Sequence, residues 1–361
     1  MPDNSESHNE SSLSVKKGVN PGNSINQRIR RSHNQRHSQT VEEFVNGIRE
    51  GNRTILSQAI TLIESARAEH QEKAQEIIEK CLPDTGNSIR LGITGVPGVG
   101  KSTFIEALGN HLIEKGRKLA VLAVDPSSSR SKGSILGDKT RMETLANSAQ
   151  AFIRPSSTGG SLGGVARKTR ESIYLCEAAG FDTIFIETVG VGQSETAVHS
   201  MIDFFLLLML AGAGDELQGI KRGIMEMADL IAINKVDEAN LKSVKQAVRE
   251  YKSALHLYRE EESGWRPKVT TCSALTGKGI DKVWKFVQSY INTTKKNDYF
   301  AQNRHHQAKH WMYEAINHQL KKAFYSDSIV QEELGTIEKQ VSAGKISPFK
   351  AAQQLLEHYQ Q

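Results

Sequence analysis

The chain of 361 residues has little of what marks secreted, membrane-spanning or metal-clustering proteins. Its three cysteines, Cys81, Cys176 and Cys272, are odd in number and far apart, which predicts reduced core thiols and excludes a disulfide framework. The printed N-terminus has no apolar segment of the signal-peptide kind. The most hydrophobic run, residues 204–213, is shorter than the roughly 20 residues that cross a bilayer, and it suits a buried parallel strand. We therefore expect a cytoplasmic protein without a membrane association.

The centre of the chain has no excess of either positive or negative charge. Residues 1–40 carry six Lys or Arg against three Asp or Glu, residues 295–361 carry nine against seven, and the rest balance at 31 of each. A neutral centre predicts no nucleic-acid partner. The first 39 residues are rich in Ser, Asn, Gln and His, which predicts a disordered tail.

A phosphate-binding loop is predicted at residues 95–102, which read Gly-Val-Pro-Gly-Val-Gly-Lys-Ser. Its glycines let successive N–H groups approach a β-phosphate, where a Cβ would clash. Lys101 would reach the β- and γ-phosphates, and the Ser102 hydroxyl would bind Mg²⁺. A plain glycine-rich turn is the alternative, but a predicted strand precedes the loop and a predicted helix follows it. The residues expected to contact nucleotide here are Gly95, Val96, Pro97, Gly98, Val99, Gly100, Lys101, Ser102 and Thr103.

The base is predicted from Asn-Lys-Val-Asp at residues 234–237, which ends an apolar strand. An aspartate there accepts two hydrogen bonds from the N1–H and 2-amino groups of guanine, whereas adenine offers no such pair. The lysine would lie along the base and steady the phosphate loop. A segment after the next strand fits the backbone element that contacts the guanine O6. The base-contacting candidates are Asn234, Lys235, Asp237, Ser273, Ala274 and Leu275.

Carboxylates for Mg²⁺ are expected at strand ends. Glu187 ends a predicted strand and begins Glu-Thr-Val-Gly, where most GTPases have Asp-X-X-Gly, and the N–H of Gly190 would contact the γ-phosphate. A strand-ending acid at an ordinary turn is the alternative. Asp125 and, in the loop that follows it, Asp138 are candidates to complete the metal shell, because Mg²⁺ prefers oxygen ligands; both could instead be solvated loop residues.

The catalytic group is less specified than the binding groups. Lys101, Glu187 and Gln193 are the candidates, but Gln193 does not occupy the position of the water-orienting Gln in Ras-type proteins. Arginines 130, 141 and 170 could each supply positive charge, and the sequence does not choose among them. We expect slow intrinsic hydrolysis that a partner accelerates.

Strands alternate with helices between residues 89 and 292, which predicts a doubly wound α/β fold with a mostly parallel sheet and ligands at the carboxyl ends of its strands. The expected strands are 89–94, 119–124, 151–154, 182–187, 204–210, 230–234 and 268–272. We divide the chain into a tail (1–39), an N-terminal helical arm (40–86), a P-loop GTPase domain (87–294) and a C-terminal helical arm (295–361).

The two arms are predicted to be helical for different reasons. In the first, Thr40 and Glu43 match a capping box, and a second helix is expected to run from Gly51-Asn52 to the turn at 83–86, on the outside of the nucleotide domain. In the last, apolar stripes recur at helical spacing, with Gly344 as a stop and Ser347-Pro348 as a new start. Those stripes must be buried on their own domain or in a homodimer.

Five motifs together resemble the MeaB/ArgK family of GTPases, which have Glu in the third motif and include the human methylmalonic aciduria type A protein. The resemblance covers about residues 41–361. Its motifs are Gly-Val-Pro-Gly-Val-Gly-Lys-Ser (95–102), Val-Asp-Pro-Ser-Ser-Ser (124–129), Leu-Gly-Asp-Lys-Thr-Arg-Met (136–142), Glu-Thr-Val-Gly-Val-Gly-Gln-Ser-Glu (187–195) and Gly-Asp-Glu-Leu-Gln-Gly-Ile-Lys (214–221).

The resemblance implies a GTP- and Mg²⁺-dependent chaperone of an adenosylcobalamin-dependent acyl-CoA mutase, most often methylmalonyl-CoA mutase, that gates cofactor loading and protects the mutase from inactivation. It assigns Asp125, Asp138 and Glu187 to the metal shell. It also implies that Gln218 and Lys221, in a third switch, relay the nucleotide state to the mutase, and that the C-terminal arm dimerises.

Two other classes share parts of this pattern. A nickel or zinc metallochaperone GTPase would need a Cys-X-Cys-Cys or a Cys/His cluster, and only His305, His306 and His310 cluster at all. A phosphotransferase acting on a transport protein, the older label of the family, would need a substrate-binding domain, which the sequence does not reveal.

Overall fold

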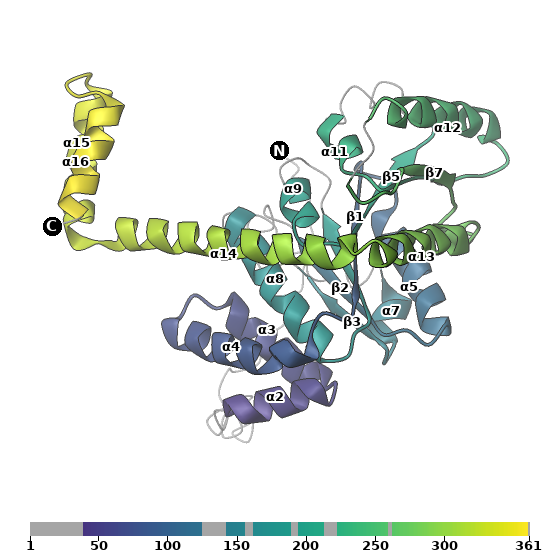
Figure 1. Ribbon diagram of the computed structural model, residues 1–361, viewed down its shortest axis with the longest axis horizontal. Helices are drawn as coiled ribbons and strands as arrows, with labels where there is room; N and C mark the ends of the chain where they lie inside the picture. Colours follow the sequence, from purple (N-terminus) through teal and green to yellow (C-terminus); the bar gives the residue numbers. More distant parts are fainter. Residues whose placement is uncertain are drawn as a thin grey trace, which may run out of the picture. The chain divides into compact units, whose positions relative to one another are not determined.

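A seven-stranded parallel sheet forms the centre of the protein in the computed structural model (Figure 1). The structure describes residues 39–124, 142–155, 162–188, 194–212, 222–258 and 262–359. The strand order is β3-β2-β4-β1-β5-β6-β7, and each adjacent pair is parallel. The strands are β1 (Ile89–Gly95), β2 (Leu119–Val124), β3 (Ala151–Arg154), β4 (Thr183–Thr188), β5 (Phe204–Leu210), β6 (Leu230–Asn234) and β7 (Lys268–Thr271). The predicted doubly wound α/β fold is confirmed, with every strand boundary within one residue of expectation.

Helices cover both faces of the sheet, as in Figure 1. One face carries α8 (Leu162–Ala178) and α12 (Leu241–Leu255), and the other carries α5 (Lys101–Glu114) and α13 (Ile280–Lys296). Shorter helices are α7 (Glu143–Asn147), α9 (Ser194–His199) and α11 (Arg222–Glu226). Because both faces are covered, the central strands are continuous apolar runs.

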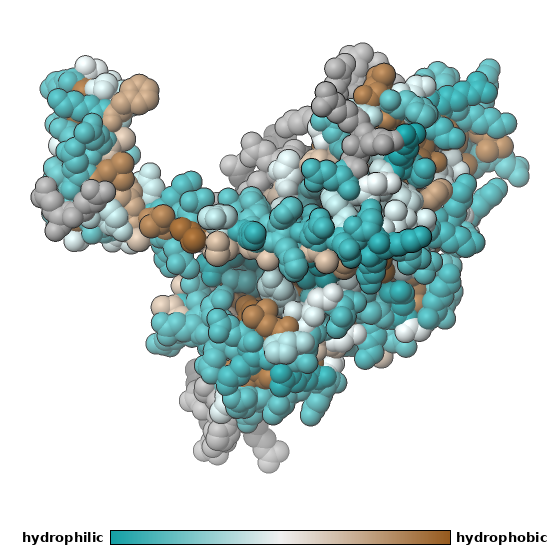
Figure 2. Space-filling view, in the orientation of Figure 1, coloured by the Kyte–Doolittle hydropathy of each residue, from teal (hydrophilic) through white to brown (hydrophobic). Residues whose placement is uncertain are grey.

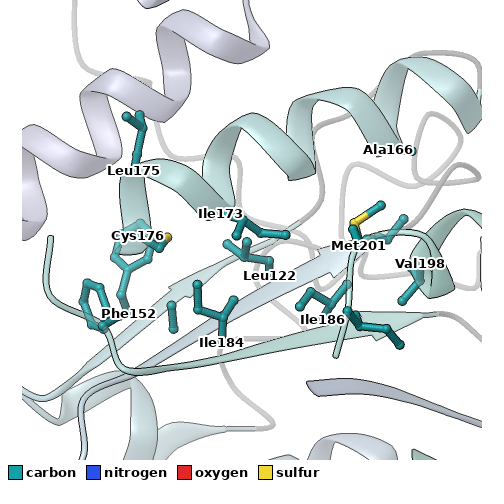
Figure 3. Packing of buried hydrophobic residues seen from close by; sticks show 14 of the residues in the cluster. Leu122, Phe152, Ala166, Ile173, Leu175, Cys176, Ile184, Ile186, Val198 and Met201 are labelled. Atoms are coloured by element: carbon teal, nitrogen blue, oxygen red, sulfur yellow. The ribbon is translucent and has the colours of Figure 1, made fainter. Parts of the chain in front are cut away.

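Alternate residues of each strand enter different cores. Ile184 and Ile186 of β4 pack toward α8, whereas Phe185 between them packs toward α5 and α13. Figure 3 shows the first core, with Ile173 and Cys176 of α8 lying over the strands. The period-two alternation of strand side chains therefore divides one hydrophobic run between two cores.

The N-terminal arm contains three helices, so the expected single helix after Asn52 is wrong. The helices are α2 (Val41–Arg49), α3 (Arg53–Glu64) and α4 (Ala68–Cys81), followed by the short turn η1 (Leu82–Asp84). The helical conformation is interrupted at residues 65–67, where the Ser65 hydroxyl accepts a hydrogen bond from the N–H of Arg67 at 3.3 Å. A serine hydroxyl can bond to a nearby backbone N–H and so compete with the helix, and no glycine or proline is needed in the sequence for this to happen.

The break also changes which side chains face the core. Leu56, Ala59, Ile60 and Ile63 are the buried residues of α3, whereas Ala66, which the expected single helix would have included, is exposed outside the helix. The arm packs on the domain as expected. Its residues share one core with α8, and polar contacts join it to the edge strand β3, where Arg53 Nη1 donates to the carbonyl of Ala151 at 2.8 Å.

Three helices follow α13: α14 (Tyr299–Ser326), α15 (Ser328–Ser342) and α16 (Pro348–Tyr359). Gly344 has a φ of +66°, which agrees with its predicted role as a helix stop. The last two helices pack on each other through Val330, Ile337, Ala351 and Leu355. None of the helices in the described ranges is long and apolar enough to span a bilayer.

The long helix α14 meets the domain through its N-terminal half. Gln307 Nε2 donates to the carbonyl of Ile202 at 2.7 Å, and Trp311 Nε1 donates to the carbonyl of Ser200 at 2.8 Å. Further along, Ile316 and Leu320 are exposed, and Figure 2 shows hydrophobic atoms on the surface of this helix. In α14 the apolar side chains are therefore packed on the domain at Trp311, which is half-buried, and are exposed at Ile316 and Leu320.

Candidate nucleotide-binding site

Glycines shape a cradle between β1 and α5. Gly98 and Gly100 have φ angles of +78° and +89°, which favour glycine. A Cβ on Gly95 would lie 2.5 Å from the carbonyl oxygen of Leu208, so no larger residue fits. The N-terminus of α5 follows at Lys101, where unpaired N–H groups and the helix dipole favour an anion. The geometry suits a phosphate group, as the sequence predicts.

Lys101 lies within this cradle. Its Nζ donates to the carbonyl of Gly95 at 2.9 Å. Burial lowers the pKa of Lys101, and the nearby carboxylates of Glu187 and Glu195 oppose that shift. The buried Glu195, on α9, was not a predicted site residue. It is the last residue of the motif at 187–195, and that position is the signal that could have identified it.

Glu187 lies at the carboxyl end of β4, beside both the phosphate-loop strand and β2. It is in register with Ile93 of β1 and with Ala123 of β2. The next residue, Thr188, donates its hydroxyl to that of Thr94 at 2.7 Å in a buried contact. This hydroxyl pair joins the carboxyl ends of β1 and β4. Sequence reasoning did not find it, because 94 residues separate the two threonines.

Asn234 connects the phosphate loop to the segment at 273–275. Its Nδ2 donates to the carbonyl of Val99 at 2.9 Å, and its Oδ1 accepts from the N–H of Ala274 at 3.0 Å. The side chain is buried. Three motifs far apart in the sequence therefore meet at one edge of the sheet, as we expected.

The N–H groups of the 273–275 segment are partly engaged already. Ser273 donates to the carbonyl of Lys278 at 2.9 Å, and Ala274 donates to Asn234. Among these three residues, Leu275 is thus the candidate donor to the guanine O6. A leucine side chain has no hydrogen-bond donor, so only the backbone N–H of this exposed residue is suited to that contact.

Lys235 and Asp237 occupy a turn after β6. Lys235 has a φ of +58°, and its Cε would lie 3.8 Å from a Cβ on Gly100, so its aliphatic stem lies beside the phosphate loop as expected. Asp237 is exposed, and its Oδ1 accepts from the N–H of Asn240 at 2.9 Å. Asn240 was not predicted. Its position three residues after Asp237, just before a helix, is the signal that could have drawn attention to it.

Several predicted residues lie outside the described residues: Asp125, Arg130, Asp138, Arg141, Gly190, Gln193, Gln218 and Lys221. Arg170 is described and buried on α8. It stacks on the ring of Trp311 at 5.6 Å and donates weakly to the Ser200 hydroxyl at 3.3 Å. These contacts belong to α14 and the end of α9, and none of them involves the phosphate loop.

Comparisons with known proteins identify the family of the chain and support its fold. The family model described as methylmalonyl Co-A mutase-associated GTPase MeaB matches residues 56–328. A probable GTPase of Mycobacterium tuberculosis is 50% identical over 318 residues, which cover 88% of this chain and 95% of that protein.

Two further relatives extend the match. The mouse protein named methylmalonic aciduria type A homolog, mitochondrial, is 44% identical over 329 residues, covering 88% of this chain and 79% of the mouse protein. The crystal structure of an LAO/AO transport system kinase is 38% identical, covers 89% of this chain and 98% of its own, and superimposes with a TM-score of 0.71. The chain therefore belongs to the MeaB family and is a GTPase.

Proposed function

We propose that this GTPase is a chaperone of an adenosylcobalamin-dependent acyl-CoA mutase, with methylmalonyl-CoA mutase as the first client to test. Hydrolysis of GTP would gate cofactor loading and protect the mutase from inactivation. The family description and the name of the mouse relative support this client. The observation that supports the nucleotide part is the bridge from Asn234 to Val99 and Ala274, because it joins the two segments proposed to bind the base to the loop proposed to bind the phosphates.

The phosphates would bind in the glycine cradle. N–H groups of residues 95–103 would surround the β-phosphate, and Lys101 would exchange its bond to the Gly95 carbonyl for the phosphate oxygens. A phosphate would also restore the pKa of Lys101, since it supplies the negative charge that offsets burial.

The carboxyl edge of the sheet offers oxygen donors of the kind that Mg²⁺ prefers. Ser102 is half-buried on the first turn of α5, and Glu187 is half-buried at the end of β4. We propose that these two hold Mg²⁺ together with Asp125 and Asp138. The ion would neutralise charge on the β- and γ-phosphates.

We assign guanine recognition to Asp237, and we keep Lys101, Glu187 and Gln193 as the catalytic candidates. Asp237 is accessible to a base, and each of its oxygens keeps accepting capacity beyond the bond from Asn240. Gln218 and Lys221 are proposed to relay the nucleotide state to the mutase. We also propose that the chain forms a homodimer through its C-terminal arm and works in the cytoplasm.

The metallochaperone alternative is disfavoured by the chemistry of the thiols. Burial raises the pKa of Cys81 to about 11 and that of Cys272 to about 12, and it also raises the pKa of Cys176. A thiol must lose its proton to bind nickel or zinc. Calorimetry with Ni²⁺ and Zn²⁺ tests this alternative directly, and one tight stoichiometric site would favour it.

The client is tested by phosphate release. Purified protein with Mg²⁺ and GTP is assayed alone and with methylmalonyl-CoA mutase, and we expect the mutase to accelerate hydrolysis several-fold. An unchanged rate with a mutase that is itself active would contradict the proposed client while leaving the GTPase assignment intact. With γ-labelled GTP, label on a protein instead of in free phosphate would indicate a phosphotransferase.

A further inference from the structure

Asn240 stands at the N-cap position of α12 but does not cap that helix. An N-cap asparagine ordinarily accepts a hydrogen bond from one of the first backbone N–H groups of its helix, and in the described structure its side chain makes no such bond. The side chain turns back to the preceding loop instead. Its Oδ1 accepts from the N–H of Asp237 at 3.0 Å, and its Nδ2 donates to the carbonyl of Lys235 at 2.7 Å.

Both residues that Asn240 contacts belong to the guanine motif. Lys235 has a left-handed backbone, with a φ of +58°, which is disfavoured for any residue with a Cβ. The bond from Asn240 holds the carbonyl of this residue in place. On the other side of the turn, the N–H of Val236 donates to the carbonyl of Cys272 at 3.2 Å. The loop is therefore fixed between β7 and a single asparagine side chain.

The same side chain aims the carboxylate that would read the base. Asp237 N–H is bound by the Asn240 side chain, and Asp237 Oδ1 accepts from the Asn240 N–H at 2.9 Å. These two reciprocal bonds restrict the rotation of the aspartate backbone and side chain together. Each carboxylate oxygen can accept two hydrogen bonds, so both oxygens still have capacity for a base.

We propose that Asn240 is a positioning residue for guanine recognition. By fixing Lys235 and Asp237, it sets how strongly the protein prefers guanine to a base that lacks the 2-amino group. The inference rests on the proposed role of Asp237. It adds that the selectivity of that carboxylate depends on a side chain that does not touch the nucleotide.

The test compares the affinities of GDP, IDP and XDP by displacement of a fluorescent GDP analogue. IDP lacks the 2-amino group, so it loses one charge-assisted hydrogen bond to Asp237, and we expect wild-type protein to bind GDP about tenfold or more tightly. In Asn240→Ala, we expect that ratio to fall to about threefold or less. Asn240→Ser should give the same fall. Its hydroxyl is a good helix cap but too short to reach both loop partners, so it keeps the test valid if the alanine variant does not fold.

The matched control is Asn52→Ala. Asn52 is a true N-cap, since its Oδ1 accepts from the N–H groups of Thr54 and Ile55 at 3.0 and 3.3 Å. This variant should unfold at a lower temperature and keep the wild-type ratio of GDP affinity to IDP affinity. An equal fall of the ratio in Asn52→Ala would show a general effect of stability and would overturn the inference.

Asp237→Asn separates this inference from the proposed function. An amide at 237 should favour XDP, whose 2-oxo group accepts where the 2-amino group of guanine donates. If that switch occurs while the Asn240 variants keep the wild-type ratio, the positioning role is wrong and the role of Asp237 stands. If Asp237→Asn still prefers GDP, the proposed role of Asp237 is wrong, and the inference falls with it.

Discussion

The side-chain amide of Asn234 donates to the carbonyl of Val99 across 2.9 Å, although 135 residues separate them. The bond joins the end of β6 to the middle of the phosphate loop. The other end of the same amide accepts from the N–H of Ala274. One buried side chain therefore links the 273–275 segment directly to the phosphate loop.

Asn234→Ala should weaken both stability and nucleotide binding. The substitution leaves the Val99 carbonyl and the Ala274 N–H without this partner in a buried setting, which costs about 1–3 kcal/mol for each group. Thermal unfolding and GDP titration measure the two effects. The control is Asn297→Ala, which removes a bond from Asn297 Nδ2 to the carbonyl of Ser263 at 2.9 Å. It should lower stability and leave GDP affinity unchanged, and equal losses of affinity would contradict the bridge.

Lys101→Ala should abolish productive GTP binding. In the wild-type protein, the affinity for GDP should fall at alkaline pH. Burial lowers the pKa of Lys101, so in the nucleotide-free protein the ammonium loses its proton below the usual range for lysine. Binding of phosphate then requires the uptake of a proton, and it weakens as pH rises through the lowered pKa. GDP affinity measured from pH 7 to 10 checks this.

The control for that pH series is Lys101→Arg, because a guanidinium keeps its charge throughout the range. Its affinity for GDP should be lower at neutral pH, because the forked guanidinium does not fit the position of the lysine ammonium. That affinity should change less as the pH rises. A wild-type curve as flat as that of the arginine variant would remove Lys101 as the titrating group.

Glu177→Gln should destabilise the fold by about 3–5 kcal/mol, because it leaves Arg90 as a buried cation without its carboxylate. Arg90 Nε and Nη2 donate to the two oxygens of Glu177 at 2.8 and 3.0 Å, in a buried pair. Denaturant unfolding at pH 7 measures the loss. Asp281→Asn, which breaks the exposed pair with Lys285, is the control and should change stability little.

The same carboxylate should contribute to acid unfolding. Burial alone would raise the pKa of Glu177, but Arg90, Ser88 and Arg304 outweigh it and hold the pKa below its usual value. A lowered carboxylate pKa gives stability that is present above the unfolded-state value, near 4.5, and is lost as pH falls through the folded-state value. The free energy of unfolding of Glu177→Gln should therefore decline less than that of wild type as the pH falls. Parallel curves of unfolding free energy against pH would show that Glu177 does not contribute to acid unfolding.

Gln218→Ala and Lys221→Ala should spare basal hydrolysis and weaken its acceleration by the mutase. The reason is their proposed place in a relay from the nucleotide to the client. Phosphate release with and without mutase measures the ratio. If both variants lose basal activity, the two residues act in hydrolysis itself and not as a relay.

Much of the fold could be predicted because its signals are local. The central strands β5 and β6 are largely apolar runs, and the phosphate loop is marked by glycines that its turns require. The break at 65–67 could not be predicted, since a serine there competes with the helix through a single hydrogen bond. The helical period continued across it, and the helix did not.

Local residue patterns were enough to predict the succession of strands along the chain, the nucleotide motifs and guanine as the base, because each signal depends on residues within a few positions of one another. The folded chain was needed to identify the side chains that support these motifs: Asn234 contacts Val99, Thr188 contacts Thr94, and Asn240 contacts Lys235 and Asp237. The first two contacts depend on strand order and register, which bring residues about a hundred positions apart within 3 Å. In the third contact, the Asn240 side chain bonds to the preceding loop instead of to the first N–H groups of α12. Both arrangements are local, so the conformation of the backbone at this position was needed to tell them apart.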